Sequence, residues 1–147
     1  MATLEERIQN IEDKDEIREL TAKYCYAVVA QDSAALINMF TEDGVFDMSP
    51  DMHFEGRAQL TELYTDKIED VGPKPFIQSH VVKVDGDHAT GNCAVEIRLI
   101  DKGQAVTACG HYNDTYRRVD GEWKFALRDF QLYHWVPLAQ GWGDAAT

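Results

Sequence analysis

Apolar side chains in the first half of the chain recur every three or four residues, which is the spacing of one face of an α-helix. Asp13 or Asp15 can cap a helix that follows, and Asp32 can cap the next one. Gly56 precedes a third stretch of this kind, and residues 45–48 alternate like a short strand. The pattern therefore predicts three helices. Their inward positions are Ile17, Leu20, Tyr24, Ala27 and Val28, then Leu36, Ile37 and Phe40, then Leu60, Leu63, Tyr64 and Ile68, with Leu4, Ile8 and Ile11 continuing the first stripe upstream.

From Phe76 onward the apolar residues recur at every second position, which is the spacing of a β-strand. Four such runs cover residues 76–85, 88–100, 105–119 and 123–135, and the breaks between them contain Asp and Gly, which favour tight hairpins. The runs are longer than an average strand, and we expect them to curve. The order predicts an α+β fold, a cone-shaped α+β barrel in which three N-terminal helices pack in a strongly curved antiparallel sheet. Such a cone encloses an apolar pocket, the usual form of a small-molecule site.

The length of 147 residues fits a single domain over residues 1–147. The 26 acidic and 14 basic residues give a net charge of −12, which argues against nucleic acid or an anionic membrane surface as a partner. No run of about 18 apolar residues occurs, and the N-terminal MATLEERIQN is too polar for a signal peptide. We therefore expect a cytoplasmic protein with no membrane partner.

The sequence offers no pattern for a metal or a nucleotide cofactor. Its 3 cysteines, Cys25, Cys93 and Cys109, lack the spacing of a zinc site and are typical of small buried side chains. The 5 histidines are scattered, and no glycine-rich phosphate loop is present. We predict no metal and no cofactor.

Four segments together carry a resemblance to a known family. They are residues 15–24, 40–46, 84–91 and 110–123, which read DEIRELTAKY, FTEDGVF, VDGDHATG and GHYNDTYRRVDGEW. In this order they resemble the SnoaL-like branch of the nuclear transport factor 2-like superfamily. The resemblance implies the cone-shaped fold and a cofactor-independent lyase or isomerase of the dehydratase type, which acts on a hydrophobic cyclic small molecule in an enclosed pocket.

The resemblance also implies where a catalytic His–Asp pair would lie, and this chain lacks both members. The Asp position falls on Val29 and the His position on Pro75, neither of which can transfer a proton. Only a shift in the alignment would bring Gln78 or His80 to the His position. The chain is therefore either a lyase or isomerase that uses other groups, or a non-catalytic member that binds a hydrophobic ligand or another protein.

Alternation along residues 105–119 puts His111 and Asn113 on one face of a strand, and the resemblance implies that this face lines the pocket. His111 is then the proton-transfer group, because a histidine titrates near neutral pH. Tyr24 polarises a substrate oxygen as a hydrogen-bond donor. A buried, satisfied histidine beside an inert tyrosine is the structural alternative. The predicted substrate-binding residues are Asn113, Ser79, Val29, Ile97, Leu132, His134, Phe46 and Met48.

The opposite face of the same strand carries Tyr112 and Tyr116, which we expect with His80 on the outer side of the sheet. Exposed apolar patches of this kind usually mark an interface. We therefore expect a homodimer or a homotrimer. The hydrophobic small molecule of the pocket is the other expected partner.

Overall fold

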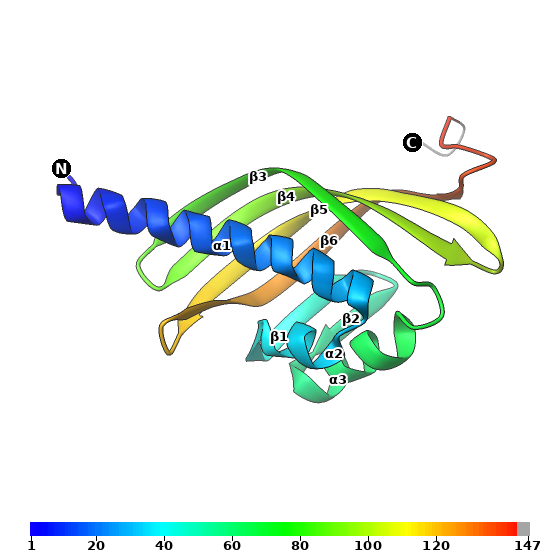
Figure 1. Ribbon diagram of the computed structural model, residues 1–147, viewed down its shortest axis with the longest axis horizontal. Coiled ribbons are helices and arrows are strands. Elements are labelled where there is room, and N and C mark those ends of the chain that lie inside the picture. The colour runs from blue at the N-terminus through cyan, green and yellow to red at the C-terminus, as the bar shows by residue number, and fades with distance from the viewer. Residues whose placement is uncertain (144–147) are drawn as a thin grey trace.

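The computed structural model describes residues 1–143, and its elements follow the predicted order, except that residues 52–55 form an additional strand and Phe40 lies in a strand rather than in the second helix (Figure 1). The helices and strands are α1 (Leu4–Ala30), α2 (Ser33–Asn38), β1 (Phe40–Met48), β2 (Met52–Glu55), α3 (Gly56–Glu62), the π-helical turn η1 (Leu63–Lys67), β3 (Lys74–Asp85), β4 (His88–Asp101), β5 (Gln104–Val119) and β6 (Glu122–Pro137). None of the helices within residues 1–143 is long and apolar enough to cross a membrane.

The first helix is longer than the sequence pattern predicts. At its start, the Thr3 hydroxyl accepts from the Glu6 N–H and the Glu6 carboxylate accepts from the Thr3 N–H, which forms a capping box. α1 therefore begins at Leu4 rather than after Asp13. Its first turns project beyond the sheet (Figure 1), so the upstream stripe is exposed rather than buried. The exposed apolar residues of these turns are Leu4, Ile8 and Ile11.

The strands form one curved sheet in the order β2-β1-β6-β5-β4-β3. All neighbouring strands are antiparallel except β1 and β6, which run parallel. The four long strands and their hairpins confirm the predicted meander. Within the described residues, β2 and β3 are the two edges and do not pair with each other. The α+β fold is therefore confirmed, with a strongly curved sheet that stays open instead of closing into a barrel.

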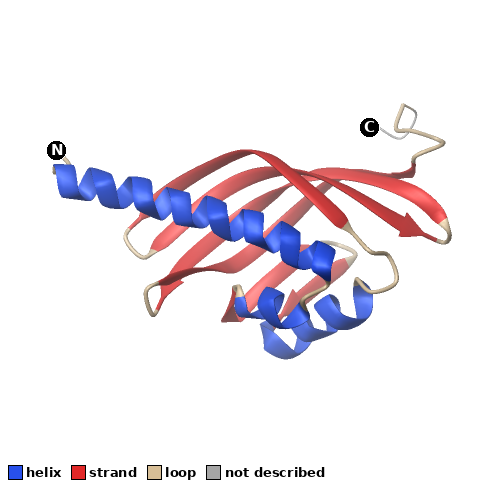
Figure 2. Cartoon of the chain, in the orientation of Figure 1, coloured by secondary structure: helices blue, strands red, loops and turns tan. Residues whose placement is uncertain are grey.

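The helices pack on the concave face of the sheet (Figure 2). The core between the two layers contains residues from both halves of the chain. Its fully buried apolar members include Ile17, Leu36, Phe40, Leu60, Tyr116 and Phe125. Burial of one such large side chain contributes about 1.5–3 kcal/mol, so this layer of contacts holds the helices against the sheet.

Bulges in β3 and β6 decide which side chains face the concave side. In β3 the register shifts between Gln78 and Val81, where Ser79 has a left-handed backbone with φ of 53°. In β6, Ala126 and Tyr133 are bulge residues, which have no partner in the register with β5. Each extra residue reverses the alternation of the side chains that follow it.

Candidate functional site

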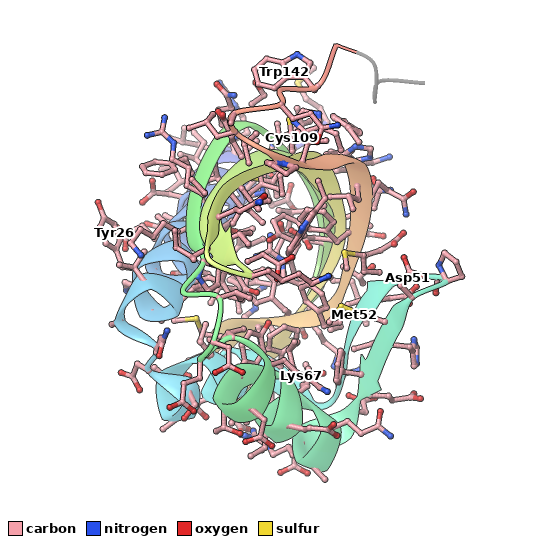
Figure 3. The ribbon with its side chains drawn as sticks, turned by 90° about the vertical axis from the view of Figure 1, so that its right-hand side faces the viewer. Tyr26, Asp51, Met52, Lys67, Cys109 and Trp142 are labelled. Atoms are coloured by element: carbon pink, nitrogen blue, oxygen red, sulfur yellow. The ribbon has the colours of Figure 1, made fainter. Side chains whose placement is uncertain are left out.

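A pocket of about 280 Å³ lies on the concave face, between α1, the α3–η1 segment and the sheet. This volume is just below the usual range for small-molecule sites, about 300–1,000 Å³. Figure 3 looks along the concave face from the end of the β4–β5 hairpin and labels two lining residues, Met52 and Lys67. Most of the wall is apolar and includes Val28, Phe46, Met48, Pro75, Ile97, Leu132 and Trp135.

Three tyrosines form the buried polar part of the pocket wall. The hydroxyls of Tyr24 on α1 and Tyr64 on η1 are hydrogen-bonded to each other at 2.7 Å. Tyr112 of β5 also lines the pocket and is 3% exposed, and its hydroxyl has no hydrogen-bond partner within residues 1–143. Burial raises the pKa of all three phenols. They are therefore neutral at physiological pH and act as hydrogen-bond donors.

A buried ion pair lies behind these tyrosines. Arg128 of β6 donates from Nε and Nη2 to the two carboxylate oxygens of Asp114 on β5, at 2.9 and 3.0 Å. The guanidinium carbon is 3.6 Å from the ring centre of Tyr112 and 4.5 Å from that of Tyr24. Burial alone would lower the pKa of Arg128, but the Asp114 carboxylate raises it well above its ordinary value. Arg128 is therefore a permanent positive charge next to two of the three phenols.

The Nη1 atom of Arg128 is the one buried side-chain nitrogen or oxygen in residues 1–143 that lacks a hydrogen-bond partner. The faces of aromatic rings surround the guanidinium instead, since Phe125 also lies 4.4 Å from its central carbon. Cation–π attraction of this kind is worth about 2 kcal/mol when desolvated, which offsets part of the cost of the missing hydrogen bond.

His80 extends this polar network towards the edge strand. The Tyr116 hydroxyl donates to Oδ2 of Asp114 at 2.9 Å, and Nε2 of His80 is 3.0 Å from the same hydroxyl. Because that hydroxyl already donates to the carboxylate, His80 donates to its oxygen from Nε2. Burial lowers the pKa of His80, so the neutral ring is favoured. The expectation that His80, Tyr112 and Tyr116 face outward is therefore wrong, since all three lie inside.

The two polar residues predicted for the pocket from β5 lie on the outer face of the sheet. Nδ1 of His111 is hydrogen-bonded to the Tyr133 hydroxyl at 2.6 Å, and the Asn113 side chain accepts from the amide of Asn92. The alternation is as predicted but has the opposite phase, because Tyr112 takes the inward position. His111 and Asn113 therefore do not reach the pocket.

Three other predicted binding residues also lie outside the pocket. Ser79 is exposed at the β3 bulge, which turns the next residue inward instead. Val29 is 48% exposed on the solvent side of α1, one helical step from the lining residue Val28. The extra residue in β6 turns His134 outward, where its ring stacks on Trp142 with 5.2 Å between centres.

The remaining predicted residues border the pocket. Tyr24, Phe46, Met48, Ile97 and Leu132 all contribute to its wall. Their proposed roles in binding or catalysis stay predictions.

The sequence patterns assigned no role to Asp114 or Arg128, placed Tyr112 on the outer face of the sheet and placed Tyr64 only in the core. A signal for the inward phase was present, because Tyr112 and Tyr116 offer far more apolar surface than Asn113 and Thr115 on the opposite face. Nothing local marks Arg128 as buried, since a lone Arg in a strand normally faces solvent.

Metal-ligating side chains do not gather in the described part of the chain. Within residues 1–143, no group of three or more His, Cys, Asp or Glu side chains is placed to hold a metal ion. The pocket wall contains tyrosines, one lysine and apolar groups. The arrangement can therefore bind an apolar body and donate hydrogen bonds to an oxygen.

The profile of the SnoaL-like domain matches residues 9–129 of the chain. A comparison with curated protein sequences gives no match. Among solved structures, a protein of unknown function from Mycobacterium tuberculosis is 29% identical, with a TM-score of 0.75 over 82% of this chain and 76% of that chain.

Two similar structures have enzyme names. A protein described as a candidate scytalone dehydratase from Novosphingobium aromaticivorans is 20% identical, with a TM-score of 0.80 over 87% of this chain and 89% of that chain. A hexachlorocyclohexane dehydrochlorinase from Novosphingobium barchaimii is 17% identical, with a TM-score of 0.80 over 90% of this chain and 94% of that chain. At these identities the two likenesses show the shared fold alone.

Proposed function

The chain belongs to the SnoaL-like family, and we propose that it binds a hydrophobic, oxygen-bearing small molecule in the pocket of the concave face. The observation that carries this proposal is the cluster of Tyr24, Tyr64 and Tyr112 in a wall that is otherwise mostly apolar. Apolar pockets with a few convergent polar groups are the usual form of small-molecule sites. The small volume suits a compact ligand of one or two rings.

The tyrosine cluster selects for an oxygen on that ligand. Covering a hydroxyl with a ligand that offers it no partner costs about 1–3 kcal/mol, and no group of the described residues accepts a hydrogen bond from the Tyr112 hydroxyl, which borders the pocket. A ligand oxygen that accepts its proton removes that cost. A pure hydrocarbon of the same shape fills the pocket but leaves the cost in place, so it binds more weakly.

A cofactor-independent lyase or isomerase is the second candidate function, and the position of Arg128 favours it. Its charge lies against the rings of Tyr24 and Tyr112, where it stabilises negative charge that develops on an oxygen held by these hydroxyls. The His–Asp positions of the family supply no proton acceptor here, because Pro75 lies in the wall and Val29 faces solvent. Polarisation of the oxygen is therefore the chemistry that the chain's own residues offer.

The binding proposal is tested with 2-naphthol and naphthalene, which share a ring system and differ by one hydroxyl. We expect 2-naphthol to bind about two- to tenfold more tightly, the value of one hydrogen bond, as measured by calorimetry. Tyr112→Phe removes this preference, and His111→Ala on the outer face is the matched control that keeps it. If neither probe binds, the proposal is wrong.

Catalysis is tested separately by hydrogen–deuterium exchange of a substrate analogue. A lyase or isomerase that polarises a carbonyl speeds the exchange of the neighbouring C–H hydrogens in D₂O, which mass spectrometry detects in 2-tetralone. Exchange that depends on Tyr24 and Arg128 supports the second candidate. Tight binding with no exchange above the buffer rate supports binding alone.

A further inference from the structure

We propose that the ligand of this pocket is a hydrophobic acid whose carboxylate binds Lys67 at the pocket rim. This inference rests on the proposed function and adds the chemical class of the ligand. It is carried by the position of Lys67, by its weak pairing with other groups, and by the charge of the chain.

Lys67 is the one charged residue among those that line the pocket in the described chain. It ends the π-helical turn η1, which also brings Leu63, Tyr64 and the following Ile68 to the wall. Short π-helical turns are rare and occur often at functional sites. The wider turn lets residues on consecutive turns of the helix border one cavity. The same turn therefore supplies both a buried phenol and a half-exposed ammonium group to the pocket.

The ammonium group of Lys67 is only weakly engaged. Its ion-pair partner, Glu62, lies 3.9 Å away, and the two side chains are 53% and 54% exposed. An exposed pair at this distance contributes at most about 1 kcal/mol. A ligand carboxylate that approaches Lys67 therefore displaces little.

The positive charge of Lys67 stands out in a chain that is acidic as a whole. The chain has 26 acidic and 14 basic residues, and yet the charge on the pocket wall is positive. A carboxylate cannot enter the apolar interior without a large desolvation cost, whereas at a half-exposed lysine it stays partly hydrated and gains a charge-assisted hydrogen bond. The pocket therefore fits an apolar body inside, an oxygen at the tyrosines and a carboxylate at Lys67.

The test compares 6-hydroxy-2-naphthoic acid with its methyl ester, which keeps the rings and the hydroxyl but removes the charge. We expect the acid to bind wild-type protein about five- to tenfold more tightly in calorimetry, and added salt to reduce the difference. Lys67→Met keeps most of the side chain but removes its charge, so the acid loses its advantage over the ester. Glu62→Gln is the matched control, and it strengthens binding of the acid.

The outcomes separate this inference from the proposed function. Equal binding of acid and ester to the wild type, or equal weakening of both by Lys67→Met, overturns the carboxylate assignment and leaves the pocket as a binding site. If neither compound binds, the proposed function fails and this inference fails with it.

Discussion

The guanidinium of Arg128 and the carboxylate of Asp114 face each other across β6 and β5, and both side chains are 0% exposed. The pair neutralises two charges inside the concave face. It also holds Arg128 against the rings of Tyr24 and Tyr112, which form the polar part of the pocket. The stability of the sheet and the chemistry of the pocket therefore depend on one contact.

Asp114→Asn tests how much this ion pair contributes to the stability of the fold. We expect the free energy of unfolding to fall by about 3–5 kcal/mol, because the charge of Arg128 stays buried without a counter-charge. Urea unfolding followed by circular dichroism measures the change. The control is Asp43→Asn, which breaks the exposed pair with Arg117 and lowers the stability by at most about 1 kcal/mol. Equal losses of stability in the two variants would show that the buried ion pair contributes no more to stability than the exposed one.

Gly110 of β5 lies beside the β6 bulge at Tyr133. A Cβ atom there would lie well inside contact distance of the Gln131 carbonyl oxygen, which belongs to the backbone and cannot move away freely. We expect Gly110→Ala to lower the stability by about 1–3 kcal/mol. Thermal unfolding measures the loss as a fall of several degrees in Tm.

Gly143 supplies the control for this substitution, because a Cβ there meets nothing within 4 Å among residues 1–143 and its backbone has no positive φ. Gly143→Ala is expected to leave Tm unchanged. An unchanged Tm for Gly110→Ala would mean that the two strands separate easily at the bulge.

The element types of this chain follow from local patterns in its sequence. Apolar spacing of three to four residues and of two residues is a property of each segment alone, so the helices, the long strands and the hairpins could be predicted without their neighbours. The apolar wall of the pocket follows from the same rule, since Phe46, Met48, Ile97 and Leu132 are apolar residues that the fold turns inward.

The buried ion pair behind the pocket could not be predicted in this way, because it depends on a bulge. A two-residue turn at Asp120–Gly121 alone would pair Asp114 with Leu127, and only the extra residue Ala126 brings Arg128 opposite Asp114. One residue also separates a predicted inward Ser79 from the observed inward His80. Such shifts depend on how neighbouring strands meet, and no local pattern states them.

The three cysteines are expected to differ in reactivity. Cys109 is partly exposed on the outer face, whereas Cys25 and Cys93 are buried, and burial raises the pKa of Cys93 to about 11. Because the thiolate is the reactive form, one thiol per chain should react quickly with Ellman's reagent at pH 8. Cys109→Ser should abolish this fast phase. Fast reaction of two or three thiols in the native protein would contradict the buried positions.

The expected homodimer or homotrimer stays a prediction, and two exposed surfaces test it. Ile8 on the projecting turns of α1 is 46% exposed, and Tyr133 on the outer face of the sheet is 57% exposed. We expect light scattering to give two or three times the mass of one chain. Ile8→Glu and Tyr133→Glu then show which surface is used, because only the one in the interface yields monomers. A monomeric wild type contradicts the prediction.

His80 should make the folded chain sensitive to mild acid. Burial lowers its pKa from the ordinary value of 6.5, so the unfolded chain binds this proton more readily than the folded chain. The stability due to neutral His80 is therefore fully present above about pH 6.5, and it is lost as the pH falls from there through the lower folded-state value. Urea unfolding at a series of pH values between about 8 and 5 measures the loss.

His80→Gln keeps a donor for the Tyr116 oxygen and cannot take up a proton, so we expect a shallower decline in stability with acid than in the wild type. His111→Gln is the control, because His111 lies on the outer face beside Tyr133 and its substitution should leave the slope unchanged. Titration of the His80 ring by NMR gives its pKa directly. A value at or above 6.5, or an equal slope in His80→Gln, would assign the acid sensitivity to groups other than His80.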